Sequence, residues 1–246
     1  MMRVLIAALV VQTALAAPSV AGQTNVAVAA NFTEPAKEIA ALFKQETGHV
    51  AILSFGASGA FFTQITHDAP FQVFLSADAV RPKAATDAGY AVPGSQFTYA
   101  IGKLVLWSKV INVTNGDEAL KAGAFSKLAI ANPNAVPYGA AAIETMKALG
   151  VYDTLASKIV EGETTAQAFQ FVDAKNAEVG FVALSQIYYG VGGWRWLVPQ
   201  DFYAPIRQDA VLLKKGDNDE ASKAFLQVLK GPEARNIIER FGYRFD

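Results

Sequence analysis

Two strand-to-helix turns near the start of the chain place a small polar residue where a helix is predicted to begin. Asn31 follows the apolar residues 25–30, and Ser58 follows the mainly apolar residues 52–57. A helix start has up to four backbone N–H groups without an internal partner and carries about half a positive charge, so it attracts anions. Two such starts, with Asn and Ser side chains beside them, predict a site for a small oxyanion.

The same arrangement occurs twice more in the second half of the sequence. The apolar residues 129–131 lead through two prolines to a helix start at Tyr138, and residues 159–164 lead to another at Thr165. Hydrogen bonds to charged groups contribute about 1.5–3 kcal/mol each, so five to seven neutral donors suffice for submicromolar affinity after the cost of closure. Four helix starts facing one cleft are therefore predicted to hold a dianion without any charged side chain.

The elements that position these residues alternate between strands and helices. Strands are predicted at residues 25–30, 50–55 and 71–76, and the helices that follow them at residues 35–45, 59–66 and 82–88. Such alternation is typical of a mostly parallel sheet with helices on both faces, in which ligands bind beyond the carboxyl ends of the strands. Asn31 and Ser58 both fall at such ends.

A long apolar run at residues 99–107 interrupts this alternation, and its predicted mate is the run at residues 209–213. Between them lies a second α/β set, with strands at residues 127–131, 159–160, 179–184 and 196–198 and helices at residues 139–149 and 165–173. Two further helices are predicted at residues 218–229 and 233–241. The fold class is therefore α/β with two lobes: residues 23–100 together with 207–246, and residues 101–206. Two connecting strands, at residues 98–107 and 203–213, are predicted to form the hinge of the cleft.

The first residues concern location. Residues 1–22 combine a positive start at Arg3, an apolar stretch at residues 4–15 and small residues suited to cleavage. The stretch is shorter than the roughly 20 residues that span a bilayer. We therefore predict a removed signal peptide and a protein exported to the periplasm.

Composition excludes several other classes of protein. The chain has no cysteine and a formal net charge of −1, and its 21 Lys and Arg residues are scattered rather than clustered. No footprint for nucleic acid or an acidic membrane is visible. The sequence has no Ser-His-Asp order around a nucleophile elbow, no metal-ligand cluster and no phosphate loop, so it does not predict an enzyme.

Six segments carry a resemblance to a known family. In order, they are Ala-Ala-Asn-Phe (29–32), Phe-Gly-Ala-Ser-Gly (55–59), Val-Phe-Leu-Ser-Ala-Asp (73–78), Ala-Asn-Pro-Asn-Ala-Val-Pro-Tyr-Gly (131–139), Val-Gly-Phe-Val-Ala (179–183) and Lys-Gly-Pro-Glu-Ala (230–234). With them the chain resembles the periplasmic molybdate-binding proteins of ABC importers over nearly its whole mature length. The resemblance implies a two-lobed periplasmic binding protein of type II, with molybdate or tungstate as transported ligand and no other cofactor. It also implies a membrane permease as partner and, we expect, a monomer.

The resemblance further implies which residues contact the anion. Asn31 stands where the family usually has Ser, and Ser58 matches the family's second contact through its side chain and N–H. Tyr138 and Thr165 match two backbone donors of the second lobe. Some members also have a Tyr where this chain has Ala183. We therefore expect the Tyr138 hydroxyl to supply the missing donor.

Each of these residues also has a purely structural interpretation. Asn31 and Ser58 are common helix caps, the Tyr138 ring could cover the rim of the cleft, and the Thr165 side chain could be incidental beside its N–H. Asp78 is predicted to be an internal cap, because a carboxylate repels a dianion.

Two other functions stay open at this stage. Tyr188 and Tyr189 suit a ferric ion, since tandem phenolates bind a hard cation, but no carboxylate or His lies next to them in the sequence. Sulfate or phosphate is the other oxyanion alternative. His49 and His67 lack metal-ligand company and are predicted to be surface residues near helix ends.

Overall fold

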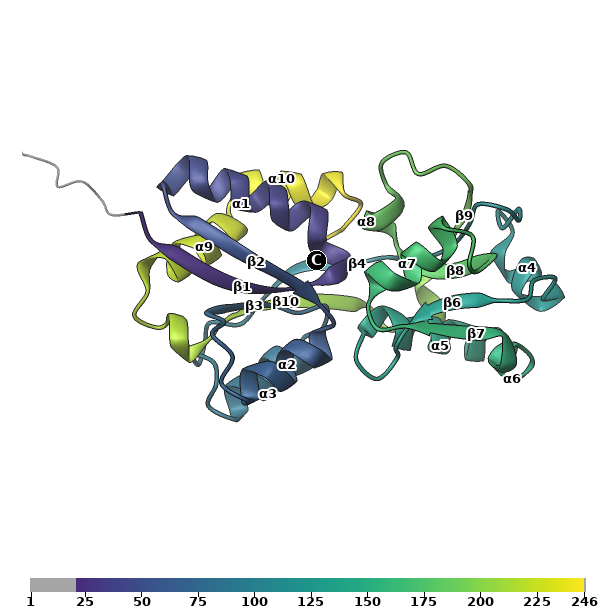
Figure 1. The fold of residues 1–246 in the computed structure, drawn as a ribbon, viewed down its shortest axis with the longest axis horizontal. Helices are drawn as coiled ribbons and strands as arrows, with labels where there is room; N and C mark the ends of the chain where they lie inside the picture. The colour runs from purple at the N-terminus through teal and green to yellow at the C-terminus, as the bar shows by residue number, and fades with distance from the viewer. Residues whose placement is uncertain (1–20, 246) are drawn as a thin grey trace, which may run out of the picture.

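The computed structural model describes residues 21–245, which form two α/β lobes lying side by side (Figure 1). The strand order is β2-β1-β3-β10-β4 in the first sheet and β7-β6-β8-β5-β9 in the second. The predicted two-lobed α/β architecture is confirmed. Residues 1–20, which make up most of the predicted signal peptide, lie outside the described residues. No helix within residues 21–245 is long and apolar enough to cross a membrane.

The first lobe is built on a mixed sheet. Its strands are β1 (Gln23–Ala29), β2 (Val50–Gly56), β3 (Val73–Leu75), β4 (Phe97–Gly102) and β10 (Ile206–Leu212). Its helices are η1 (Ala30–Phe32), α1 (Thr33–Thr47), α2 (Ser58–Thr66), α3 (Val80–Asp87), η4 (Lys214–Gly216), α9 (Glu220–Lys230) and α10 (Pro232–Arg240). β1 runs parallel to β2 and β3, whereas β10 is antiparallel to β3 and β4. Helices α1, α9 and α10 cover one face of the sheet, and α2 and α3 cover the other (Figure 1).

The second lobe repeats this plan with a different chain order. Its strands are β5 (Leu104–Ser108), β6 (Leu128–Ala131), β7 (Ile159–Gly162), β8 (Val179–Ala183) and β9 (Trp194–Leu197). Its helices are α4 (Gly116–Ala122), α5 (Pro137–Ala148), α6 (Tyr152–Leu155), η2 (Ala156–Lys158), α7 (Thr165–Asp173), α8 (Leu184–Ile187) and η3 (Gln200–Phe202). β6 is parallel to β7 and β8, and β5 is antiparallel to β8 and β9.

Alternation along the central strands decides which side chains face which layer of helices. In β5, Leu104 and Leu106 join the core that includes α5, whereas Val105 and Trp107 join the core that includes α7. All these side chains are buried. A strand covered on both faces reads as a continuous apolar run, which is why this segment was recognisable as a strand from the sequence.

The chain crosses between the lobes twice. β4 ends at Gly102 and β5 begins at Leu104, and the two strands belong to different sheets. The predicted connecting segment at residues 98–107 is therefore divided into two strands, with Lys103 between them. The return path is residues 198–205, and β10 lies entirely in the first sheet.

Candidate functional site

Four helix starts follow the carboxyl ends of neighbouring parallel strands, two in each lobe. Asn31 follows β1, Ser58 follows β2, Tyr138 follows β6 and Thr165 follows β7. Their side chains are buried, with exposures of 3%, 1%, 2% and 2% respectively. The lobes meet at these turns. The Asn31 carbonyl accepts a hydrogen bond from Ser185 of the second lobe, and the Tyr138 hydroxyl accepts one from Gln208 in β10 of the first sheet. The four turns therefore form one candidate site.

Backbone donors are left over at these helix starts. The first N–H groups of a helix have no intrahelical acceptor, and the residues that precede α2 and α5 provide no side-chain cap. Thr164 caps α7 by accepting a hydrogen bond from the third residue of the helix. Within residues 21–245, the structure gives no hydrogen bond to the backbone N–H groups of Ser58, Tyr138 and Thr165. These groups are free to bind an anion.

Two hydroxyls add to the backbone donors. Ser58 Oγ accepts a hydrogen bond from the backbone N–H of Ala77 at 2.9 Å, which leaves its own hydrogen to be donated. Thr165 Oγ1 is buried and has no hydrogen-bond partner in the described part of the chain. An unpartnered buried hydroxyl costs about 1–3 kcal/mol, so it points to a ligand. Sequence reasoning assigned a role only to the Thr165 N–H and missed this hydroxyl.

Asn31 uses its side chain differently from the prediction. Its Nδ2 donates to Gln208 Oε1 and to the Tyr243 hydroxyl, each at 2.9 Å. Its carbonyl oxygen accepts from Ser185 Oγ and from the same Tyr243 hydroxyl, each at 2.8 Å. The side-chain donors of Asn31 are thus engaged inside the protein, and its backbone N–H in η1 is the group left for an anion.

Three residues of this network, Gln208, Tyr243 and Ser185, were not predicted. They come from β10, from the segment after α10 and from α8. No local motif marks them, because only the fold brings these separate segments to the junction between the lobes. The segment after α10 does so by returning to this junction (Figure 1).

The Tyr138 side chain is buried inside the candidate site and does not cover the rim of the cleft. Its hydroxyl accepts a hydrogen bond from Gln208 Nε2 at 3.2 Å, so its own hydrogen is available to donate. A Cβ added at Gly102 would lie 2.1 Å from this hydroxyl oxygen, so the phenol depends on a glycine there. Burial raises the pKa of Tyr138 well above its usual value, which keeps the phenol neutral and able to donate.

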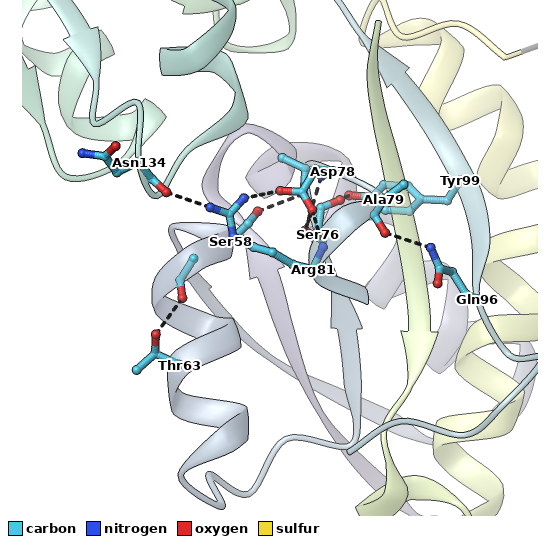
Figure 2. Close-up of polar contacts among 11 residues, drawn as sticks. Ser58, Thr63, Ser76, Asp78, Ala79, Arg81, Gln96, Tyr99 and Asn134 are labelled. Atoms are coloured by element: carbon cyan, nitrogen blue, oxygen red, sulfur yellow. Dashed lines mark hydrogen bonds and ion pairs between the residues drawn. The ribbon is translucent and has the colours of Figure 1, made fainter. Parts of the chain in front are cut away.

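The carboxylates near the candidate site accept hydrogen bonds from other side chains and backbone groups of the protein. Asp78 accepts from the backbone N–H of Arg81 at 2.8 Å and pairs with the Arg81 guanidinium (Figure 2). The prediction that Asp78 is an internal cap is confirmed. The buried Asp209 accepts from Gln96 and Thr98 at 2.6 and 2.7 Å.

Direct hydrogen bonds hold the two lobes together around the site. The Arg81 guanidinium donates to the Asn134 carbonyl of the second lobe at 2.8 Å (Figure 2). Beside it, the Gly59 N–H donates to the Ala135 carbonyl at 2.9 Å. We call these two bonds the Arg81 bridge. They close one side of the site. An outer cleft of about 610 Å³ is lined by Arg81 and by none of the four predicted residues.

Tyr188 and Tyr189 do not form a cation site. Tyr189 donates its hydroxyl to the Arg240 carbonyl at 3.1 Å, and its ring packs against Phe241. Both tyrosines are exposed, at 42% and 54%. No group of three or more His, Cys, Asp or Glu residues suited to a metal ion occurs in residues 21–245. The pair therefore makes a contact between the lobes.

The two histidines lie near helix ends, as predicted. His49 follows α1 and accepts from the Gly22 N–H at 2.8 Å, and the ring of the exposed His67 contacts the Thr63 carbonyl at 2.8 Å at the end of α2.

Comparisons with known proteins identify the family of this chain. Residues 24–244 match the model of the family described as bacterial extracellular solute-binding protein. The chain is 57% identical to the molybdate-binding protein ModA of Rhodobacter capsulatus, covering 96% of this chain and 94% of that protein. It is 51% identical to ModA of Azotobacter vinelandii, covering 93% and 92%. The solved periplasmic molybdate-binding protein of Azotobacter vinelandii superposes with a TM-score of 0.87 at 38% identity, covering 91% of this chain and 99% of that one. The chain therefore belongs to the bacterial extracellular solute-binding protein family.

Proposed function

We propose that this protein captures molybdate, and its close analogue tungstate, in the periplasm and delivers it to the membrane permease of an ABC importer. The names of its relatives support the ligand. The observation that carries the proposal is the set of unpaired neutral donors at buried helix starts between the two lobes. Residues 1–22 are removed on export, and the protein acts as a monomer without catalytic activity or nucleic acid.

The donors we assign come from the four predicted residues. Asn31, Ser58, Tyr138 and Thr165 each give a backbone N–H, and the last three also give a hydroxyl. Hydrogen bonds to a charged group contribute about 1.5–3 kcal/mol each, so such a set supports submicromolar binding once the cost of closure is subtracted. Of the nearby carboxylates, Asp78 is paired with the Arg81 guanidinium, and Asp209 accepts hydrogen bonds from Gln96 and Thr98.

Specificity follows from the fixed positions of these donors. A rigid shell fits one oxyanion radius, and sulfate, with its shorter bonds, would leave the hydrogen bonds stretched. Protonated phosphate would bring a hydrogen into a shell made only of donors, where it finds no acceptor. Molybdate and tungstate differ little in size and charge, so both should bind.

The test of this function is a thermal-denaturation panel on the purified mature protein. Molybdate and tungstate at 100 times their dissociation constants should stabilise it by about 2.7 kcal/mol, which raises the melting temperature by roughly 5–11 °C for a chain of this size. Sulfate, phosphate and ferric citrate should leave it unchanged. A shift with ferric citrate or sulfate alone would overturn the proposal.

Weakening the Arg81 bridge is expected to have a smaller effect than losing an anion donor, and the effect should be on the rate of ligand release. Arg81→Ala removes one hydrogen bond across the lobes and also the cation paired with Asp78, so the closed form should be less stable and molybdate should leave about three to ten times faster. Stopped-flow fluorescence would measure the release rate. Lys83→Ala is the matched control, because Lys83 lies on the same helix and pairs with Asp87 of its own lobe. Equal release rates for Arg81→Ala and Lys83→Ala would contradict the role of the bridge.

A further inference from the structure

Gln208 occupies a central place that the proposed function does not explain. Its side chain is fully buried, at 0% exposure. It lies where the register of β10 against β4 shifts between Gln208 and Asp209, and such irregularities re-aim side chains next to functional sites. Its amide contacts Asn31 and Tyr99 in the first lobe and Tyr138 in the second. One side chain therefore links both lobes at the candidate site.

The orientation of this amide follows from its neighbours. The Tyr243 hydroxyl has two acceptors for its hydrogen, the Asn31 carbonyl at 2.8 Å and Ser185 Oγ at 3.0 Å. In the structure the Asn31 side-chain atom that faces Tyr243 is the donor Nδ2, at 2.9 Å. The same Nδ2 faces Gln208, so the atom of Gln208 there must be the acceptor Oε1.

The consequence falls on Tyr138. With Oε1 turned to Asn31, the Nε2 of Gln208 must face the Tyr138 hydroxyl, to which it donates at 3.2 Å. The phenolic oxygen is thereby an acceptor on that side, and its hydrogen points elsewhere. The orientations of the Asn31 and Gln208 amides thus set which way the Tyr138 hydroxyl donates.

We propose that Gln208 is a positioning residue that makes the Tyr138 hydroxyl a donor to the bound oxyanion. This inference rests on the proposed function, because it assumes an anion at the four helix starts. It also makes Gln208 a determinant of ligand charge. A hydroxyl locked as a donor favours a fully deprotonated oxyanion and penalises one that presents its own hydrogen.

The titratable groups around Gln208 do not change which atoms of this network donate and which accept hydrogen bonds. The phenols facing it are Tyr99, Tyr138 and Tyr243, and burial raises the pKa of the first two well above their usual value and that of Tyr243 to about 12. All three stay neutral in ordinary buffers. The adjacent Asp209 is turned to Gln96 and Thr98.

Gln208→Glu tests the polarity directly. A carboxylate accepts at both oxygens, so the Tyr138 hydrogen would turn to it, and the anion would lose a donor and meet a negative charge. Molybdate affinity, measured by calorimetry, should fall at least about 100-fold near pH 8. It should recover as the pH is lowered to about 6, because a buried carboxyl has a raised pKa and its protonated form can again donate to Tyr138. Wild-type affinity should stay flat over this range.

A double-mutant cycle keeps the proposal testable if the glutamate variant does not fold. Gln208→Met and Tyr138→Phe should each weaken molybdate binding by about 10- to 100-fold. The double variant should be no weaker than the worse single one, because both changes remove the same hydrogen bond to the anion. Tyr99→Phe, which removes the other hydroxyl on Oε1, should stay within about threefold of wild type.

The outcomes separate this inference from the proposed function. A wild-type protein that does not bind molybdate would refute the function itself. Wild-type binding combined with additive losses in the cycle, or with a loss in Gln208→Glu that is independent of pH, would overturn the positioning role of Gln208 alone.

Discussion

Gly102→Ala is expected to weaken molybdate binding by at least about 100-fold while changing the free energy of unfolding of the ligand-free protein by no more than about 1 kcal/mol. The added Cβ would lie 2.1 Å from the Tyr138 hydroxyl and 2.8 Å from Gln208 Nε2. Gly102 ends the last strand before the chain crosses to the second lobe, and Tyr138 belongs to that lobe. The clash with Tyr138 therefore arises when the lobes close, whereas the contact with the end of the flexible Gln208 side chain lies within the first lobe and is present in an open form as well.

Calorimetry with molybdate would measure the affinity, and small-angle scattering would show whether the ligand still compacts the protein. Gly231→Ala is the matched control. It lies at the α9–α10 junction with an ordinary φ of −70°, and its nearest contact would be the Val228 carbonyl at 3.1 Å. Both variants should unfold at similar denaturant concentrations. Wild-type affinity in Gly102→Ala would mean that Tyr138 does not have to approach the hinge for binding.

The parts of the fold that depend on local pattern were predictable from the sequence. Helix α7 has the predicted limits, Thr165 and Asp173, because a capping Thr164 precedes an amphipathic stretch. The central strands were visible as apolar runs, since they are buried on both faces. The short helices α4, α6 and α8 were missed, because helices of seven residues or fewer show too little periodicity.

The division of the crossing at residues 97–108 into two strands was beyond sequence reasoning. Residues 97–108 are apolar on both sides of Lys103, and apolar character indicates burial without indicating in which sheet. The division into β4 and β5 is fixed by their partners. β4 pairs with β10 in the first lobe, and β5 pairs with β8 and β9 in the second.

The candidate site also depends on long-range contacts that the sequence alone does not reveal. Helix starts at Asn31, Ser58, Tyr138 and Thr165 are local features, and the structure brings them to the junction of the lobes. Which atoms of these residues remain free to donate depends on residues far away in the chain. Gln208, for example, is 177 residues from Asn31. The prediction that the Asn31 side chain contacts the anion could not anticipate this competing partner.

Thr165→Val is expected to separate binding from stability. Thr165 Oγ1 is buried without a partner in the described residues, so replacing the hydroxyl with a methyl of similar shape should leave the ligand-free protein equally stable or more stable by about 1 kcal/mol. If the hydroxyl donates to the oxyanion, molybdate binding should weaken by about 10- to 150-fold. Denaturant unfolding and calorimetry would measure the two effects.

The neighbouring Thr164→Val provides the opposite pattern and therefore the control. Thr164 Oγ1 caps α7 by accepting from the Gln167 N–H at 3.1 Å, so its loss should cost about 1 kcal/mol of stability and change molybdate affinity by less than about threefold. The same substitution at two adjacent threonines should thus have different effects. Thr165→Val should lower the affinity for molybdate, and Thr164→Val should lower the stability of the protein. Equal affinities in Thr165→Val and Thr164→Val would show that the anion is held at α7 by backbone N–H groups alone.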